Sequence, residues 1–235
     1  MDGAWYAGWR HLFKLDPDRE ISDEALDALC MSGTDAIMVG GSSGVTFDNT
    51  VELMSRIRRY AVDCVLEVTS LEAAVPGFDY YLVPLVLNAD KPEWLIGRQT
   101  EAVREFGHLI PWEITAGEGY LILNGEATAA KVSGARTDIT EDEALAYVQA
   151  ADRLMRLPVV YIEYSGAFGD MTLVKRAAQT VSQARIVYGG GIDSPERAVQ
   201  AASSAHTVVV GNIIYSDLDA AVATVQAVKE TNLAL

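Results

Sequence analysis

Short runs rich in β-branched and aromatic residues recur along the chain, and stretches with the periodicity of amphipathic helices separate them. This alternation is typical of βα units around a parallel sheet. A chain of 235 residues can bury one large core, and eight such runs suit a closed barrel. We therefore predict one α/β domain over residues 1–235, a (β/α)₈ TIM barrel. The predicted strands are His11–Leu15, Ala36–Val39, Cys64–Val68, Tyr80–Leu87, Gly119–Leu123, Val159–Tyr164, Arg185–Tyr188 and Thr207–Val210.

Helix start signals stand where this fold requires them. Ser22 precedes two acidic residues, and Thr140 forms a capping box with Glu143. Pro195 follows a serine and suits the first position of a helix. The polar stretch from Pro92 to about His108 predicts a longer helix after the fourth strand.

One connection is too short for this pattern. Between the third and fourth predicted strands, residues 69–79 cannot hold a crossover helix together with its loops. We predict that this helix is missing or replaced by a short segment, which leaves a gap in the outer ring for a long apolar ligand. A short loop without a ligand role is the alternative. The apolar residues expected to line the gap are Leu71, Ala74, Val75 and Phe78.

Two glycine-bearing strand ends lie near the C-terminus, Tyr188–Ile192 and Val208–Asn212, and a helix start follows each. Backbone N–H groups and helix N-termini would converge there, as at phosphate sites. The loops after strands 7 and 8 are where (β/α)₈ barrels bind phosphate.

Charged side chains close the first strand. Lys14 and Asp16 share one face and should project together at the barrel mouth. A buried ion pair of structural value is the alternative. On the sixth strand, Tyr161, Glu163 and Ser165 share a face, so Glu163 could accept a proton from an attacking hydroxyl. Pairing of Glu163 with a lysine or arginine is the alternative.

Composition excludes several partners. The net charge of −15 would repel nucleic acid and an anionic membrane surface. No apolar run reaches the ~20 residues that span a bilayer. Cys30 and Cys64 are too few for a disulfide framework, and no secretory signal begins the sequence, so we expect a cytoplasmic protein. The histidines lack metal-ligand spacing; a metal would be a hard cation such as Mg²⁺, held by a carboxylate such as Asp16 together with substrate phosphates.

Six motifs in order along the chain resemble the geranylgeranylglyceryl and heptaprenylglyceryl phosphate synthase family. They are Phe13–Pro17, Ser32–Ala36, Val83–Asn88, Tyr161–Gly166, Tyr188–Ile192 and Val210–Asn212. The resemblance implies a Mg²⁺-dependent prenyltransferase that joins sn-glycerol-1-phosphate to a polyprenyl diphosphate, forms an ether and releases diphosphate. It also implies a barrel without its third helix, and commonly a homodimer.

The resemblance carries roles to individual residues. Lys14 would contact glycerol phosphate, while Asp16 and Ser42 would serve the Mg²⁺–diphosphate; the family often has threonine where Ser42 stands. With Lys14 and Asp16, Glu163 would be catalytic, orienting or deprotonating the glycerol hydroxyl. The segment expected to bind glycerol comprises Tyr161, Ile162, Glu163, Tyr164, Ser165 and Gly166. The residues expected to cradle its phosphate are Gly191, Gly211 and Asn212.

The length of the prenyl chain is expected to depend on the helix after the fourth strand. Family members that use geranylgeranyl chains tend to carry a bulky aromatic residue there, and those that accept heptaprenyl diphosphate a small one. The corresponding residue is Ala102, one turn before Phe106. We therefore favour the heptaprenyl branch, with the geranylgeranyl enzyme as the alternative.

Two other function classes share parts of this pattern. A sugar-phosphate lyase or isomerase would use Lys14 as a Schiff base, which requires a neutral amine, whereas Asp16 should keep it charged. A non-catalytic lipid- or phosphate-binding module would keep the glycine cradle. It would give no reason for Asp16, Ser42 and Glu163 to meet at one mouth.

Overall fold

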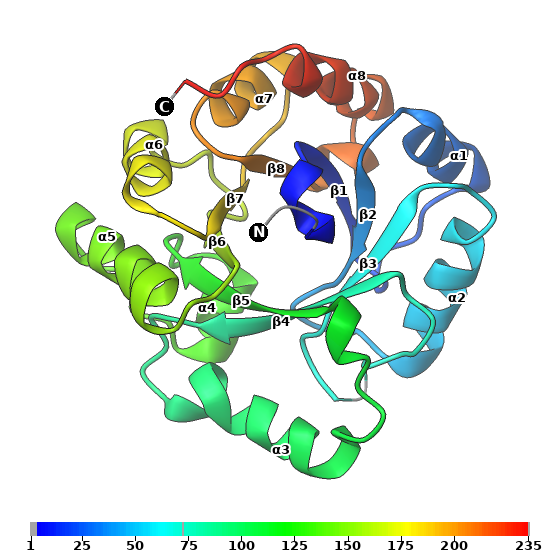
Figure 1. The fold of residues 1–235 in the computed structure, drawn as a ribbon. Coiled ribbons are helices and arrows are strands. Elements are labelled where there is room, and N and C mark those ends of the chain that lie inside the picture. Colours follow the sequence, from blue (N-terminus) through cyan, green and yellow to red (C-terminus); the bar gives the residue numbers. More distant parts are fainter. Residues whose placement is uncertain (1–3, 72, 235) are drawn as a thin grey trace.

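The computed structural model describes residues 4–71 and 73–234. Its strands form a closed barrel in which each strand pairs in parallel with the next, and the last pairs with the first. Figure 1 shows the strands at the centre and the helices around them. The predicted (β/α)₈ fold is confirmed. Within the described residues the strands are β1 (His11–Leu15), β2 (Ala36–Val39), β3 (Asp63–Glu67), β4 (Tyr80–Val86), β5 (Thr115–Ile122), β6 (Val159–Glu163), β7 (Arg185–Gly189) and β8 (Thr207–Val210).

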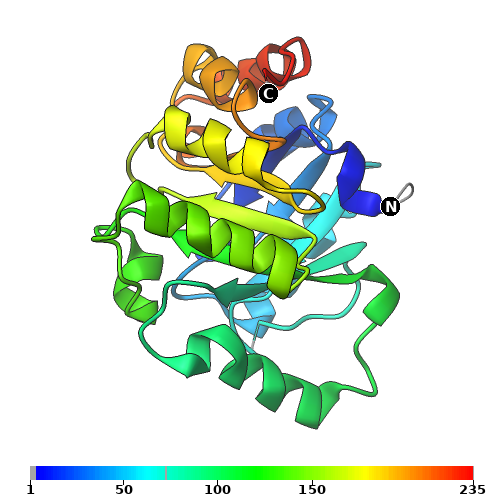
Figure 2. The same ribbon diagram turned by 60° about the vertical axis from the view of Figure 1, so that its left-hand side comes forward.

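The helices cover the outer surface of the barrel, as Figures 1 and 2 show from two sides. The start signals act as predicted: the Ser22 hydroxyl caps the first helix, and Thr140 and Glu143 form the capping box. The α-helices are α1 (Asp23–Met31), α2 (Phe47–Ile57), α3 (Arg98–Phe106), α4 (Thr128–Ser133), α5 (Glu141–Gln149), α6 (Met171–Thr180), α7 (Pro195–Ala202) and α8 (Leu218–Lys229). Shorter turns are η1 (Trp5–Gly8), η2 (Glu93–Gly97), η3 (Trp112–Ile114), η4 (Ala150–Leu154) and η5 (Asn212–Tyr215).

Two elements differ from the sequence-based expectation. β5 begins at Thr115, four residues before the predicted start, because residues 115–118 pair with β4 although they lack the alternation of a strand. The short helix α4 was not predicted, since its six residues carry little periodicity.

Between β3 and β4 no helix forms among the described residues of the connection, as predicted. The expected lining of the gap was only partly right. Leu71 faces a cavity and Ala74 is exposed, whereas Val75 and Phe78 are buried in the core between barrel and helices. The Tyr81 hydroxyl donates to the Val75 carbonyl (3.2 Å), which holds this connection against the barrel.

Aromatic side chains close the N-terminal end of the barrel. Trp5 stacks on Tyr80 with ring centroids 4.3 Å apart, and the ring of the buried Trp9 lies 5.0 Å from that of Trp5. The cavity left beneath these rings measures about 10 Å³, room for no more than one water molecule. The closed end directs any substrate to the opposite mouth.

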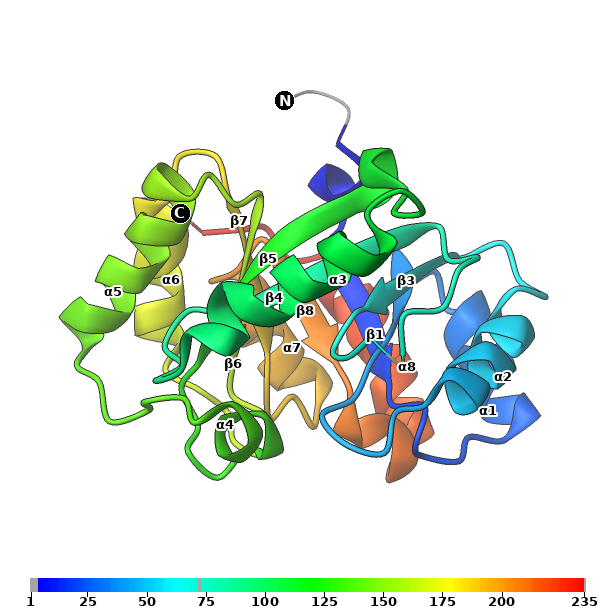
Figure 3. The same cartoon turned by 90° about the horizontal axis from the view of Figure 1, so that it is seen from below.

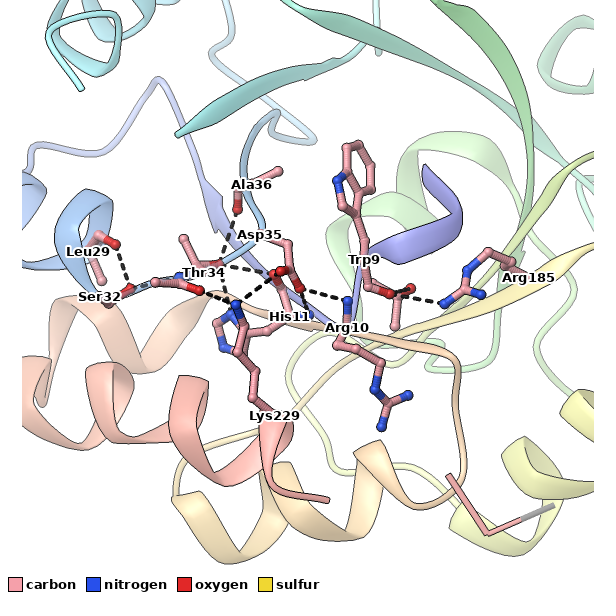
Figure 4. Close-up of polar contacts among 12 residues, drawn as sticks. Trp9, Arg10, His11, Leu29, Ser32, Thr34, Asp35, Ala36, Arg185 and Lys229 are labelled. Atoms are coloured by element: carbon pink, nitrogen blue, oxygen red, sulfur yellow. Dashed lines mark hydrogen bonds and ion pairs between the residues drawn. The ribbon is translucent and has the colours of Figure 1, made fainter. Parts of the chain in front are cut away.

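A polar cluster fixes the start of β1 at this closed end (Figure 4). One Asp35 oxygen accepts the backbone N–H groups of Arg10 (2.7 Å) and His11 (2.9 Å). The His11 ring nitrogens lie 2.9 Å from the hydroxyls of Thr34 and Thr224, and burial lowers the pKa of His11 to about 3. His11 is therefore a neutral structural residue of the core.

The barrel interior changes from apolar to charged toward the C-terminal mouth. Lys14, Glu67, Glu118 and Glu163 interact electrostatically there, and Glu118 is fully buried with neither carboxyl oxygen hydrogen-bonded. Burial raises the pKa of Glu118 well above its usual range, the charges of Glu67 and Glu163 raise it further, and Lys14 opposes them. Burial therefore favours the protonated form of Glu118.

This burial predicts an unusual pH dependence of stability. Folding raises the pKa of Glu118, so the stability that this group contributes is fully present below the pKa of an unfolded glutamate. Above that pH, the free energy of unfolding falls as pH rises toward the folded-state pKa. Glu118→Gln removes this loss. Each pH unit in that window should favour the variant over wild type by at most about 1.4 kcal/mol, or roughly 3–5 °C in Tm.

The measurement is thermal unfolding of both proteins from pH 5 to pH 9. Glu24→Gln, on the exposed start of α1, is the matched control and should follow wild type at every pH. A Tm difference between Glu118→Gln and wild type that stays constant with pH would show that Glu118 is ionised in the fold.

Candidate active site

The carboxyl ends of the strands surround a cavity of about 590 Å³ at the open mouth. Barrels of this class place their active sites at this end. Most of the predicted site residues line the cavity together, although they come from loops and strand ends far apart in the sequence. They are Lys14, Asp16, Ser42, Tyr161, Glu163, Ser165, Gly166, Gly191, Gly211 and Asn212.

Two side chains of the predicted glycerol-binding segment lie elsewhere. Ile162 is buried in the core between barrel and helices, and Tyr164 packs in the same layer with its ring 6.2 Å from that of Tyr188. The strand alternation that brings Tyr161 and Glu163 to the mouth turns these two outward. Their side chains do not reach the cavity.

Lys14 forms an ion pair with Glu67 at the end of β3. The ammonium donates to both carboxylate oxygens, at 2.8 and 2.6 Å, and the Glu67 side chain is 3% exposed. Burial alone would lower the pKa of Lys14, but the carboxylates of Glu67 and Glu163 raise it above its ordinary value. The ammonium is therefore charged and held in place for an anionic ligand.

The expected alternative of a Lys14–Asp16 ion pair was wrong, because Lys14 turns to Glu67. Sequence reasoning missed Glu67, although one signal was present: an acidic residue ends the apolar run Cys64–Leu66 at the mouth. Strand pairing could not reveal the partner, since residues on β1 and β3 meet only across the barrel interior.

Glu163 is oriented by hydrogen-bond donors. The Tyr120 hydroxyl donates to Oε2 (2.7 Å), and the backbone N–H of Ser165 donates to Oε1. Among the described residues Glu163 has no ion-pair partner, so the predicted pairing with lysine or arginine does not form. Its carboxylate lines the cavity and can accept a proton from a ligand hydroxyl.

The glycines after β7 permit close backbone approach. Gly191 has φ +57, and a Cβ there would clash with the backbone of Ala167 and Phe168. A Cβ on Gly189 would lie 2.8 Å from Cζ of Tyr161. These positions leave backbone groups facing the cavity next to the start of α7, an arrangement suited to a phosphate.

Two arginines that the sequence analysis missed flank the glycines. Arg197 donates to the Gly191 carbonyl (3.0 Å), and Arg19 donates to Oδ1 of Asn212 (3.0 Å) with its guanidinium 3.5 Å from the Tyr215 ring centroid. Both line the cavity. They place positive charge beside the proposed anion site in an acidic protein.

Asp16 lies against the loop that follows β2. A Cβ on Gly41 would lie 2.7 Å from Cγ of Asp16, so only glycine allows this approach, and the exposed Ser42 comes next. Burial raises the pKa of Asp16, although the hydrogen bond from the Asp18 N–H (3.0 Å) opposes the rise. A cation bound at this carboxylate would lower the pKa again.

A second cavity, of about 660 Å³, adjoins the first and runs toward α3. The two share Gly41, Ser42, Ser43, Tyr120 and Ala129. Ala102 lines this second cavity, which we call the apolar groove, while Phe106 lies outside its lining and is 37% exposed. The other apolar side chains of the groove are Val45, Val68, Leu71, Val83, Pro84, Val86, Trp94, Ile122, Ala129 and Val132.

The comparisons with known proteins agree with this geometry. The PcrB family model matches residues 5–229. The chain is 57% identical over 226 residues to the heptaprenylglyceryl phosphate synthase of Brevibacillus brevis, covering 96% of this chain and 98% of that protein. It is 53% identical over 223 residues to the enzyme of the same name from Bacillus cereus, covering 95% and 97%.

Solved structures give the same result. The (S)-3-O-geranylgeranylglyceryl phosphate synthase of Thermoplasma acidophilum, in complex with its substrate sn-glycerol-1-phosphate, superposes with a TM-score of 0.85 at 26% identity over 97% of this chain and 96% of that one. The tryptophan synthase alpha chain of Legionella pneumophila, at 13% identity and a TM-score of 0.57, shares the fold alone; it covers 94% of this chain and 92% of its own. The near-complete family match and the high identity to its relatives show that the chain belongs to the PcrB family.

Proposed function

We propose that this protein joins sn-glycerol-1-phosphate to a long polyprenyl diphosphate through an ether bond and releases diphosphate. The observation that carries the proposal is the junction of two unlike cavities at Gly41 and Ser42. One cavity holds a lysine, a carboxylate and a glycine cradle, and the other is mostly apolar. A phosphorylated polyol and a prenyl chain are the matching ligands.

In this proposal the glycerol phosphate lies in the 590 Å³ cavity, with its phosphate between the glycines and Lys14. A glycerol hydroxyl lies near Glu163, whose orientation is fixed by Tyr120. Its oxygen forms a bond to the first carbon of the prenyl chain as the bond from that carbon to diphosphate breaks. Glu163 takes the hydroxyl proton.

The residues at the mouth fit a magnesium ion. The carboxylate of Asp16 and the hydroxyl of Ser42 are hard oxygen donors that line the same cavity, and Mg²⁺ is commonly held by one or two carboxylates plus substrate phosphates. Within residues 4–71 and 73–234 no three His, Cys, Asp or Glu side chains cluster as metal ligands, so diphosphate oxygens would complete the shell. Such an ion would neutralise charge on the leaving diphosphate.

The competing functions fit the site less well. A Schiff-base lyase needs a neutral Lys14, but the Glu67 ion pair keeps the amine protonated. A binding module does not account for a carboxylate oriented by two donors beside the anion site. The names of the relatives and the small Ala102 favour heptaprenyl over geranylgeranyl diphosphate.

Two further properties stay predictions. The homodimer implied by the family resemblance is one. A cytoplasmic location is the other, and the buried free thiols of Cys30 and Cys64 suit it. Among the described residues, no helix combines the length and apolarity needed to cross a bilayer.

The direct test of the function uses radiolabelled sn-glycerol-1-phosphate, a series of prenyl diphosphates and Mg²⁺. Asp16→Asn should lower kcat by about 10²-fold or more, the size of effect seen when one charge-stabilising group is removed. Binding of glycerol phosphate should change little, because Asp16 serves the diphosphate. Asp18→Asn, two residues away, is the control; normal Mg²⁺-dependent turnover by Asp16→Asn would contradict the metal role.

Glu163→Gln tests the proton acceptor. The amide keeps the shape of the side chain but cannot take the hydroxyl proton, so kcat should fall by about 10²- to 10⁴-fold. Unchanged kinetics would leave Glu163 with a structural role in holding Tyr120.

Ala102→Trp tests the length limit of the groove. The indole would fill space beside the groove lining, and overpacking of about 1–3 kcal/mol should lower kcat/KM for heptaprenyl diphosphate roughly tenfold or more. Geranylgeranyl diphosphate should be used almost as before, because its shorter chain ends before the obstruction. Ala74→Trp, on an exposed residue outside the groove, is the matched control. Equal losses for both chain lengths would rule out Ala102 as the limit.

A further inference from the structure

Helix α3 is unusual among the helices of the barrel because none of its residues is buried. Figure 3 shows it lying across the outside of β4 and β5. Ala102 is half-buried, whereas Val103 and Phe106 are 44% and 37% exposed. A helix with this much exposed apolar surface usually has a further partner.

The apolar surface continues around the helix from the groove to solvent. Ala102 lines the groove, whereas Val103 and Phe106 do not; at about 100° per residue, these two follow Ala102 around α3 on the side away from the groove. Ile96 is 53% exposed. The inner edge of this apolar surface, at Ala102, is part of the groove lining itself.

Two more exposed apolar side chains follow α3 in the chain. Leu109 is 68% exposed and Trp112, in η3, is 55% exposed. We call the exposed set, Ile96, Val103, Phe106, Leu109 and Trp112, the α3 edge. An exposed tryptophan with neighbouring aliphatic side chains is typical of proteins that lie in the interfacial region of a bilayer.

The charge around the α3 edge differs from that of the whole protein. Residues 91–113 contain three basic residues, Lys91, Arg98 and Arg104, against four acidic ones. The chain as a whole carries −15. This segment is therefore close to neutral, and it adds little to the repulsion from an anionic surface that the total charge predicts.

We propose that the α3 edge lies on a lipid bilayer and that the apolar groove receives the prenyl chain directly from it. The inference rests on the proposed function, because a long prenyl chain has a negligible concentration in water and is held in a membrane. The groove and the α3 edge lie on two sides of helix α3, so the prenyl chain can pass from the bilayer into the groove without crossing water.

The test is flotation of the full-length protein with phosphatidylcholine vesicles, with and without added phosphatidylglycerol. Wild type should float with the neutral vesicles. The double variant Leu109→Asp/Trp112→Asp should bind at least tenfold more weakly. Leu154→Asp, at an 83% exposed leucine in η4, is the matched control and should bind like wild type. Wild type that stays unbound, or a double variant that binds equally, would overturn the proposal.

Two further measurements separate this inference from its alternatives. In solution, farnesyl or geranylgeranyl diphosphate should be used equally by wild type and double variant, which tests the function independently of the bilayer. With heptaprenyl diphosphate in vesicles, only the double variant should lose activity. Light scattering reports the other possible occupant: a double variant that changes from dimer to monomer while vesicle binding is unaffected would assign the α3 edge to a second copy of the chain.

Discussion

The ion pair between Lys14 and Glu67 fixes the position and the charge of the lysine at the mouth of the barrel. One ammonium stands among three glutamates in a largely dry interior, and it is fully paired with the nearest. Removal of either partner would leave a buried charge, which is far more costly than the pair itself. Burial favours the protonated form of Glu118, and the Tyr120 hydroxyl holds Glu163 in place, so Lys14 forms its ion pair with Glu67. An incoming phosphate meets a lysine whose position is already fixed.

The site has a polar cavity and an apolar groove side by side because no helix among the described residues covers the barrel between β3 and β4. In a complete ring, a helix between β3 and β4 would cover the flank of the barrel between α2 and α3. Here the connection folds back through Val75, and Leu71 is left facing the groove. The same strand ends therefore present charged groups inward and an apolar surface sideways, and the two meet at the glycine-serine loop after β2.

Patterns that depend on neighbouring residues could be predicted from the sequence. The strand order, the caps at Ser22 and Thr140, and the gathering of Lys14, Asp16 and Glu163 at one mouth all follow from alternation and local spacing. Contacts across the barrel interior could not be predicted, because strand periodicity gives the face of a residue but not its partner. Glu67 and Tyr120 were missed for this reason, whereas Arg19 and Arg197 lie outside the strands, where no periodicity marks them. The inward turn of Phe78 also depends on tertiary packing, since an exposed and a buried loop phenylalanine look alike in sequence.

The stacked rings of Trp5 and Tyr80 help to close the N-terminal end of the barrel, so the described part of the barrel opens only at its C-terminal mouth. Solvent cannot pass through from the far end, so in the proposed reaction a proton taken by Glu163 and the released diphosphate would share one exit. Regeneration of the base would then be tied to product departure, and water would reach the reacting carbon from one side only. Loss of this closure would let water enter from the far end and would cause side reactions, although the closing residues lie far from every residue that touches substrate.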